Sequence, residues 1–160
     1  MRRSVVLLTI AGVVSALAGC GGAGPTPHFQ AATGWHVLVE PGQTASAANV
    51  SFASGDRAES VPVGTIASLP RRGVVIWIEW VRRGGSPSLD KTYPKRALTL
   101  QISEAANTGT PEGTSSPGAV RRLRVQDSGW NATVWIFFGA SKPSQRQVAA
   151  ANWELSRLRI

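Results

Sequence analysis

The chain has 160 residues, a length that suits one ordinary domain and hardly allows two. Charged residues make up 16% and hydrophobic residues 42%, which excludes a charged, intrinsically disordered chain. One Cys excludes a disulfide framework and a cysteine-rich zinc site, two His exclude a histidine cluster, and the net charge of +8 favours anionic partners.

The first twenty residues follow the three-part plan of a secretory signal. Arg2 and Arg3 form a basic start, residues 5–14 are mostly apolar, and small residues lead into Leu-Ala-Gly-Cys at 17–20. The apolar stretch is short for a membrane span. We therefore expect residues 1–19 to be a signal peptide. The sequence leaves open whether export uses the general secretory or the twin-arginine route.

Residues 17–20 resemble the lipobox of bacterial lipoproteins, in which the Cys thiol receives a diacylglyceryl group. A thiolate is the side-chain nucleophile best suited to alkylation, and the only Cys of the chain lies at this position. The resemblance implies lipidation of Cys20 and a mature chain, 20–160, with a net charge of +6 once Arg2 and Arg3 are removed. The alternatives are a cleaved signal with a coincidental Cys and an uncleaved membrane anchor.

The mature chain divides into a tether and one domain. Residues 20–33 are rich in Gly and Pro and predict a short tether. Residues 34–160 are expected to form a single globular domain.

Alternation of apolar side chains predicts a series of strands. In chain order, the predicted strands span 35–40, 48–53, 73–83, 97–103, 120–127 and 130–139, with a long turn-rich loop at 105–118. The segments 73–83 and 130–139 are apolar on both faces, so we expect both to be central strands covered on each side. Trp77, Trp80 and Trp135 lie in these segments and are expected in the core, whereas Trp130 beside Gly129 is expected to be exposed at a turn.

A helix is predicted at the C-terminal end. Ser144 is the expected N-cap, and Val148, Ala151, Leu155 and Leu158 recur at helical spacing. The elements together predict an α+β fold, a mostly antiparallel β-sheet of five to six strands with one C-terminal helix packed on it. The alternative is a β-sandwich with a terminal helix.

Four short segments carry a family resemblance. They are Phe-Ala-Ser at 52–54, Leu-Pro-Arg-Arg-Gly-Val-Val at 69–75, Phe-Gly-Ala-Ser-Lys-Pro-Ser at 138–144 and Glu-Leu-Ser-Arg-Leu at 154–158. In this order they resemble small exported lipoproteins of actinobacterial type whose function is unassigned. The resemblance implies an envelope lipoprotein and supplies no catalytic residue.

The sequence contains no arrangement typical of catalysis or metal binding. It has no Gly-x-Ser-x-Gly elbow, and His36 is expected on the solvent side of its strand, without a nucleophile beside it. Glu79 interrupts an apolar face between Trp77 and Val81, where it is either paired with an Arg of a neighbouring strand or a functional acid. We assign no catalytic residue, no metal ligand and no cofactor, and enzymatic activity stays uncertain.

Basic residues occur in doublets. The doublets at 71–72 and 82–83 flank one predicted strand, so they lie at its opposite ends and cannot form one compact patch. The second doublet is placed to join basic residues across the following loop in an anionic-partner site, against the alternative of a solvated basic surface. The residues of this expected site are Arg82, Arg83, Lys95 and Arg96.

These features predict a lipid-anchored cell-envelope protein on the extracytoplasmic face of the cell membrane. Its partners would be the membrane, through the N-terminal lipid, and an anionic envelope polymer or a protein. No basic–aromatic pattern matches a nucleic-acid module. We expect a non-catalytic binding or interaction module, and the alternative is a small hydrolase that acts on cell-wall or lipid substrates.

Overall fold

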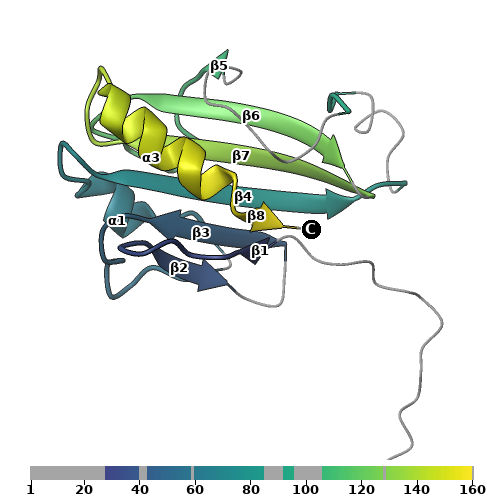
Figure 1. The fold of residues 1–160 in the computed structure, drawn as a ribbon, viewed down its shortest axis with the longest axis horizontal. Coiled ribbons are helices and arrows are strands. Elements are labelled where there is room, and N and C mark those ends of the chain that lie inside the picture. The colour runs from purple at the N-terminus through teal and green to yellow at the C-terminus, as the bar shows by residue number, and fades with distance from the viewer. Residues whose placement is uncertain are drawn as a thin grey trace, which may run out of the picture.

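The structure is a computed structural model that describes residues 28–39, 43–58, 60–84, 92–95, 106–127 and 129–159. It has the predicted α+β architecture (Figure 1). The main sheet has six strands in the order β2-β3-β4-β7-β6-β5, and all neighbouring pairs are antiparallel. A separate antiparallel ribbon pairs β1 with β8. The strands of the main sheet are β2 (His36–Val39), β3 (Thr44–Ala48), β4 (Val74–Arg82), β5 (Ala106–Asn107), β6 (Val120–Asp127) and β7 (Trp130–Phe138). The other elements are β1 (His28–Phe29), α1 (Val63–Ala67), α3 (Gln145–Leu155) and β8 (Leu158–Arg159).

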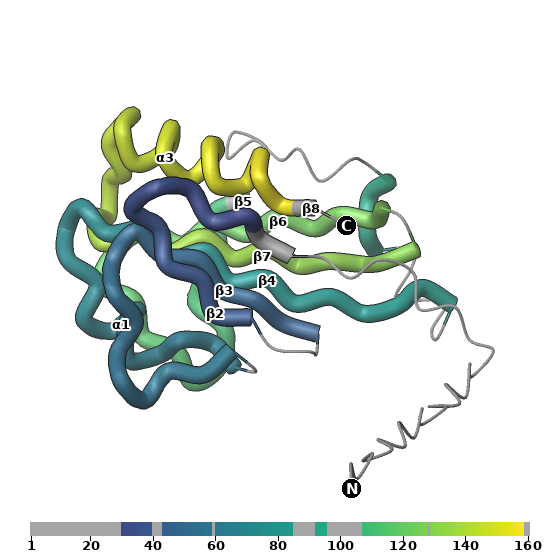
Figure 2. The backbone as a smooth tube through the Cα atoms, turned by 60° about the horizontal axis from the view of Figure 1, so that its bottom comes forward, coloured from purple at the N-terminus to yellow at the C-terminus, as the bar shows by residue number. Residues whose placement is uncertain are grey.

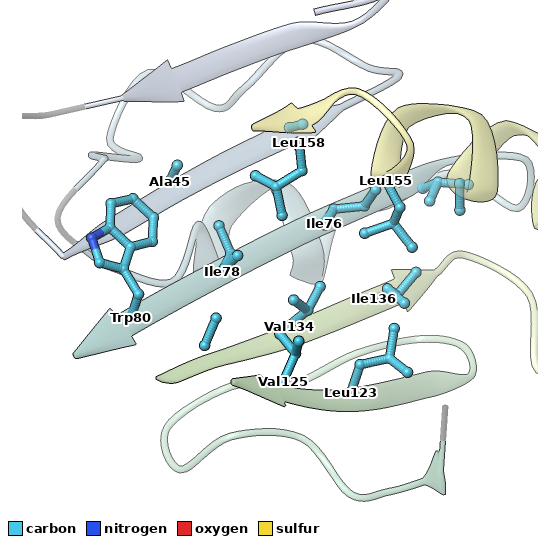
Figure 3. Packing of buried hydrophobic residues seen from close by; sticks show 14 of the residues in the cluster. Ala45, Ile76, Ile78, Trp80, Leu123, Val125, Val134, Ile136, Leu155 and Leu158 are labelled. Carbon is cyan, nitrogen blue, oxygen red and sulfur yellow. The ribbon is translucent and has the colours of Figure 1, made fainter. Parts of the chain in front are cut away.

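The two faces of the sheet are covered differently. Helix α3 and the β1–β8 ribbon lie over one face, and α1 with its flanking loops lies toward the other, as Figures 1 and 2 show together. The larger core cluster lies between the sheet and α3, and Figure 3 shows its side chains. A smaller cluster joins Ile66 of α1 to Val75, Trp77 and Phe137 on the opposite face.

The two central strands confirm the prediction from their apolar faces. β4 and β7 pair over nine residues, from Val74 opposite Phe138 to Arg82 opposite Trp130. Residues 74–78 are buried on both faces. Two apolar faces are what a strand needs when a helix covers each side of its sheet, so this pattern located the centre of the fold.

The prediction of a strand at 48–53 is wrong. The strand is Thr44–Ala48, and residues 49–53 are not part of any strand. Its sequence, Thr-Ala-Ser-Ala-Ala, lacks the bulky β-branched and aromatic side chains that usually mark a strand. Ala45 and Ala47 are fully buried in the helix-side core, and β1 lies against β3. Small side chains allow the ribbon to approach the sheet closely at this strand.

Residues 28–33 fall within the expected tether at 20–33, but they are part of the folded domain. His28 is paired with Arg159. The Gln30 amide donates to the Arg157 carbonyl at 3.4 Å, and the Ala32 amide donates to the Glu154 Oε2 at 3.2 Å. The part of the expected tether before residue 28 lies outside the described residues, as do the expected signal peptide and the expected strand at 97–103.

The C-terminal helix is confirmed, with a shorter extent. Ser144 is its N-cap: the Ser144 Oγ accepts from the Gln147 amide, and the Gln147 Oε1 accepts from the Ser144 amide. The helix ends at Leu155, whereas Leu158 belongs to β8 and pairs with Phe29. Leu158 is nevertheless buried in the main core, so its apolar character reflected burial in a strand and not a longer helix.

Candidate functional site

The two ends of the main sheet differ in what they carry, and we name each by its first basic residue. At the Arg82 end, β4 and β6 stop and β7 begins; at the Arg71 end, β4 begins and β7 stops. Helix α3 runs from the Arg71 end toward the Arg82 end, because the Gln147 Nε2 in its first turn donates to the Arg71 carbonyl at 3.0 Å. β8 continues in this direction and β1 runs against it. The chain therefore enters the domain from the side of the Arg82 end (Figure 1).

The structure brings three of the four expected site residues to the Arg82 end. Arg82 is the last residue of β4, and the Arg83 amide donates to the Gly129 carbonyl at 2.9 Å. Lys95 bridges to Gln126 on the outer side of β6. Three strand spacings, about 14 Å, separate it from β4. The three described residues of the expected site are therefore spread along the sheet edge and do not form a compact group. The fourth residue, Arg96, lies outside the described residues.

A denser basic group lies at the Arg71 end, and we call it the Arg71 cluster. Its members are Arg71, Arg72, Lys142 and Arg146, and all four side chains are exposed. They line three adjoining hollows of about 440, 440 and 300 Å³. No Asp, Glu or aromatic residue is among the described residues that line these hollows. The arrangement concentrates positive charge around one concave surface.

Close backbone packing holds the cluster in place. A Cβ on Gly139 would collide with the Pro70 carbonyl, and the Gly139 amide donates to the Gly73 carbonyl at 3.0 Å. The turn before β4 and the segment after β7 therefore lie in direct contact. The Gln147 Nε2 bonds the Arg71 carbonyl, so α3 is tied to the same turn.

The sequence interpretation missed this cluster because its two halves are about seventy residues apart along the chain. Arg71 and Arg72 precede β4, whereas Lys142 and Arg146 follow β7. Antiparallel pairing places the start of one strand beside the end of the other. The signal that could have found the cluster was thus the pairing of the two apolar strands, read together with the basic residues outside their ends.

Glu79 lies on the sheet face that α1 covers only in part. It is exposed and lines a hollow of about 290 Å³ with Tyr93, Asn131 and four other described residues. Partial desolvation raises the pKa of the Glu79 carboxyl above its usual value, and the charge of Arg124 lowers it by a smaller amount. The Tyr93 hydroxyl forms a hydrogen bond with the Thr133 hydroxyl at 2.9 Å. The Arg that attracts Glu79 is thus Arg124 on β6, which lies two strands away from β4 and not on the adjacent strand as expected.

The Trp side chains divide between core and surface. Trp77 and Trp80 are buried, as expected for the centre of the sheet, and Trp135 is half-buried with the Arg122 guanidinium 5.3 Å from its ring centre. Trp153 on α3 is 60% exposed, beside Arg157. An exposed Trp next to a cation is suited to an interface between water and an anionic surface.

Within the described part of the chain, no three His, Cys, Asp or Glu side chains are placed to hold a metal ion. None of the helices there is both long and apolar enough to cross a membrane. No protein-family model matches the chain, and no curated protein or solved structure is significantly similar to it. The resemblance to actinobacterial lipoproteins, which depends on short segments, stays a prediction.

Proposed function

We propose that the protein is a lipid-anchored domain on the extracytoplasmic face of the cell membrane and that it works by binding. One observation supports this most directly: the chain enters the fold through β1 from the side of the Arg82 end. Cys20 precedes His28 by only eight positions. A lipid on Cys20 would hold that side of the domain within about 29 Å of the bilayer at full extension.

The charges at the Arg82 end favour contact with anionic head groups. Arg82, Arg83 and Lys95 would face the same surface as the lipid anchor. A Lys or Arg near an anionic bilayer contributes about 1 kcal/mol, and salt weakens the contribution because exposed charges are screened.

The first experiment tests the anchor. Replacement of Cys20 by Ser should prevent lipidation and cleavage by a lipoprotein-type peptidase, so the variant should keep its signal peptide and be larger than the mature wild type. Retention of the variant in the membrane fraction at the wild-type size would contradict lipidation at this residue.

The second experiment tests the Arg82 end with vesicles of phosphatidylcholine, with and without phosphatidylglycerol, over a salt series. The variant Arg82→Glu/Arg83→Glu/Lys95→Glu should lose binding to the anionic vesicles at low salt. The matched control reverses three charges of the Arg71 cluster, so both variants have the same net charge. Equal loss in both variants would mean that net charge alone controls binding, and the proposal for the Arg82 end would be wrong.

A second candidate function is a small hydrolase, and the position of Glu79 in a hollow with Tyr93 and Asn131, where partial desolvation raises the pKa of its carboxyl, favours it. A carboxyl that keeps its proton to a higher pH can serve as a general acid. The test is hydrolysis of cell-wall and lipid substrates by the wild type and by Glu79→Gln. Turnover that disappears in the variant would support the enzyme over the binding module.

A further inference from the structure

The Arg71 cluster has a feature that a merely solvated basic surface does not need. Lys142 and Arg146 flank the N-cap of α3, and the first turn of this helix contains no acidic residue. The N-terminus of a helix already carries a partial positive charge, so cations there are unfavourable. Arg71 and Arg72 add two more positive charges to the same hollows. The fold therefore concentrates like charges where they lower its stability.

The concave shape and the rigid backbone suit a ligand with several anionic groups. Gly139 and Gly118 each allow a backbone contact that any Cβ would block, which locks three segments together beneath the cluster. The Ala119 amide donates to the Ala140 carbonyl at 2.9 Å in the same region. A rigid backbone lowers the ordering cost when a ligand binds.

The types of side chain indicate phosphate. Three of the four cations are Arg, whose planar guanidinium forms paired hydrogen bonds with phosphate oxygens. Three adjoining hollows can receive successive phosphates of one chain. Single-stranded nucleic acid usually needs aromatic side chains on which its bases stack, and the described lining residues include none.

We propose that the Arg71 cluster binds a polymer with repeated phosphate groups that lies away from the membrane surface. This inference rests on the proposed function for its orientation. The lipid and the Arg82 end would face the bilayer, and the Arg71 end lies at the other end of β4, about 26 Å away for a nine-residue strand. The domain would thus connect the membrane with an anionic polymer of the envelope.

The experiment uses the mature chain, residues 20–160, with Cys20→Ser, and inorganic polyphosphate as the probe in isothermal titration calorimetry. The variant Arg71→Glu/Arg72→Glu/Lys142→Glu should lower the affinity for polyphosphate by at least about tenfold, a modest contribution from each of three contacts. It should keep its binding to phosphatidylglycerol vesicles. Unchanged polyphosphate affinity would overturn the proposal.

The matched control is the triple reversal at the Arg82 end, which has the same net charge. It should keep most of its polyphosphate affinity, and equal loss in both variants would refute a specific site. If the control keeps vesicle binding while the cluster variant loses polyphosphate, the proposed function fails and the polymer site stands.

Two further measurements test the chemistry of the ligand. The variant Arg71→Lys/Arg72→Lys keeps the charge but loses the paired geometry, so it should bind polyphosphate more weakly than the wild type. Polyglutamate of similar charge should also bind more weakly. Equal affinity for both polymers would show a site for any polyanion and would contradict the assignment to phosphate.

Discussion

Replacing Arg146 by Glu should make the domain more stable while weakening its binding of polyphosphate. Arg146 is the second residue of α3, and its side chain is exposed at the positive end of the helix dipole. A charge at this position contributes about 0.3–1 kcal/mol, so reversal from unfavourable to favourable should add about 1 kcal/mol to the free energy of unfolding. Arg72 lines the same hollow, so the substitution also removes a repulsion.

The assay is thermal unfolding of the mature chain, residues 20–160, with Cys20→Ser at low and high salt. A gain of about 1 kcal/mol should raise Tm by about 3–4 °C in a domain of this size. In about 1 M salt the gain should shrink, because the Debye length is then only about 3 Å. Arg146→Gln removes the cation without adding a carboxylate and should give about half of the increase. An unchanged or lower Tm for Arg146→Glu at low salt would refute the idea that the Arg71 cluster is held at a cost in stability.

Three other substitutions test the fold. Gly139→Ala should lower the free energy of unfolding by about 2–3 kcal/mol, because the added methyl group would collide with the Pro70 carbonyl. In the control Gly55→Ala the methyl group contacts nothing, so the free energy of unfolding in urea melts should hardly change. Equal effects of the two substitutions would contradict the close contact at Gly139. Burial raises the pKa of Glu154, so the folded chain holds this proton to a higher pH than the unfolded chain, and stability should fall as the pH rises above 4.5. Glu154→Gln should flatten this fall in a series of urea midpoints, and an unaltered pH profile would exclude Glu154 as its source. Leu155→Ala should cost about 3 kcal/mol with an unchanged urea m-value, since Leu155 is fully buried under the helix, and a loss below about 1 kcal/mol would mean that α3 is not part of the core.

The centre of the sheet could be predicted because its strands carry many large apolar side chains. β4 and β7 have apolar residues on both faces, and β6 alternates Leu123 and Val125 with Arg side chains. These patterns depend on burial alone, which local sequence reports well.

The strand beside them could not be predicted in the same way. β3 is buried by its neighbours, although Ala and Ser would suit a loop or a helix as well. Its position depends on pairing with β2 and β4 and on contact with β1, and the local sequence does not report any of these neighbours. Val50 and Phe52 are large and apolar, and for this reason the sequence predicts a strand at 48–53. They instead pack, partly buried, against the smaller core cluster that contains Ile66 of α1.

The basic cluster shows the same limit at the level of the site. Each half is visible in the sequence as a basic pair near a predicted boundary. Their meeting depends on which strands are neighbours, and this is decided by tertiary pairing and not by local pattern. The expected site around Arg82 is inferred from residues that are close along the chain. The sheet places its described members up to three strand spacings apart.

The β1–β8 ribbon also determines how the domain would respond to tension. A pull on the N-terminal segment enters at His28 and meets a ribbon of two residues on each strand, whereas β4 and β7 are paired over nine. The ribbon yields first because far fewer hydrogen bonds resist the load. Release of residues 28–33 adds about 20 Å of contour length while the main sheet stays folded. The same step uncovers Leu158 and the Glu154 carboxyl. The unfolded segment before the main sheet therefore becomes longer, and a new apolar surface is exposed before the sheet itself unfolds.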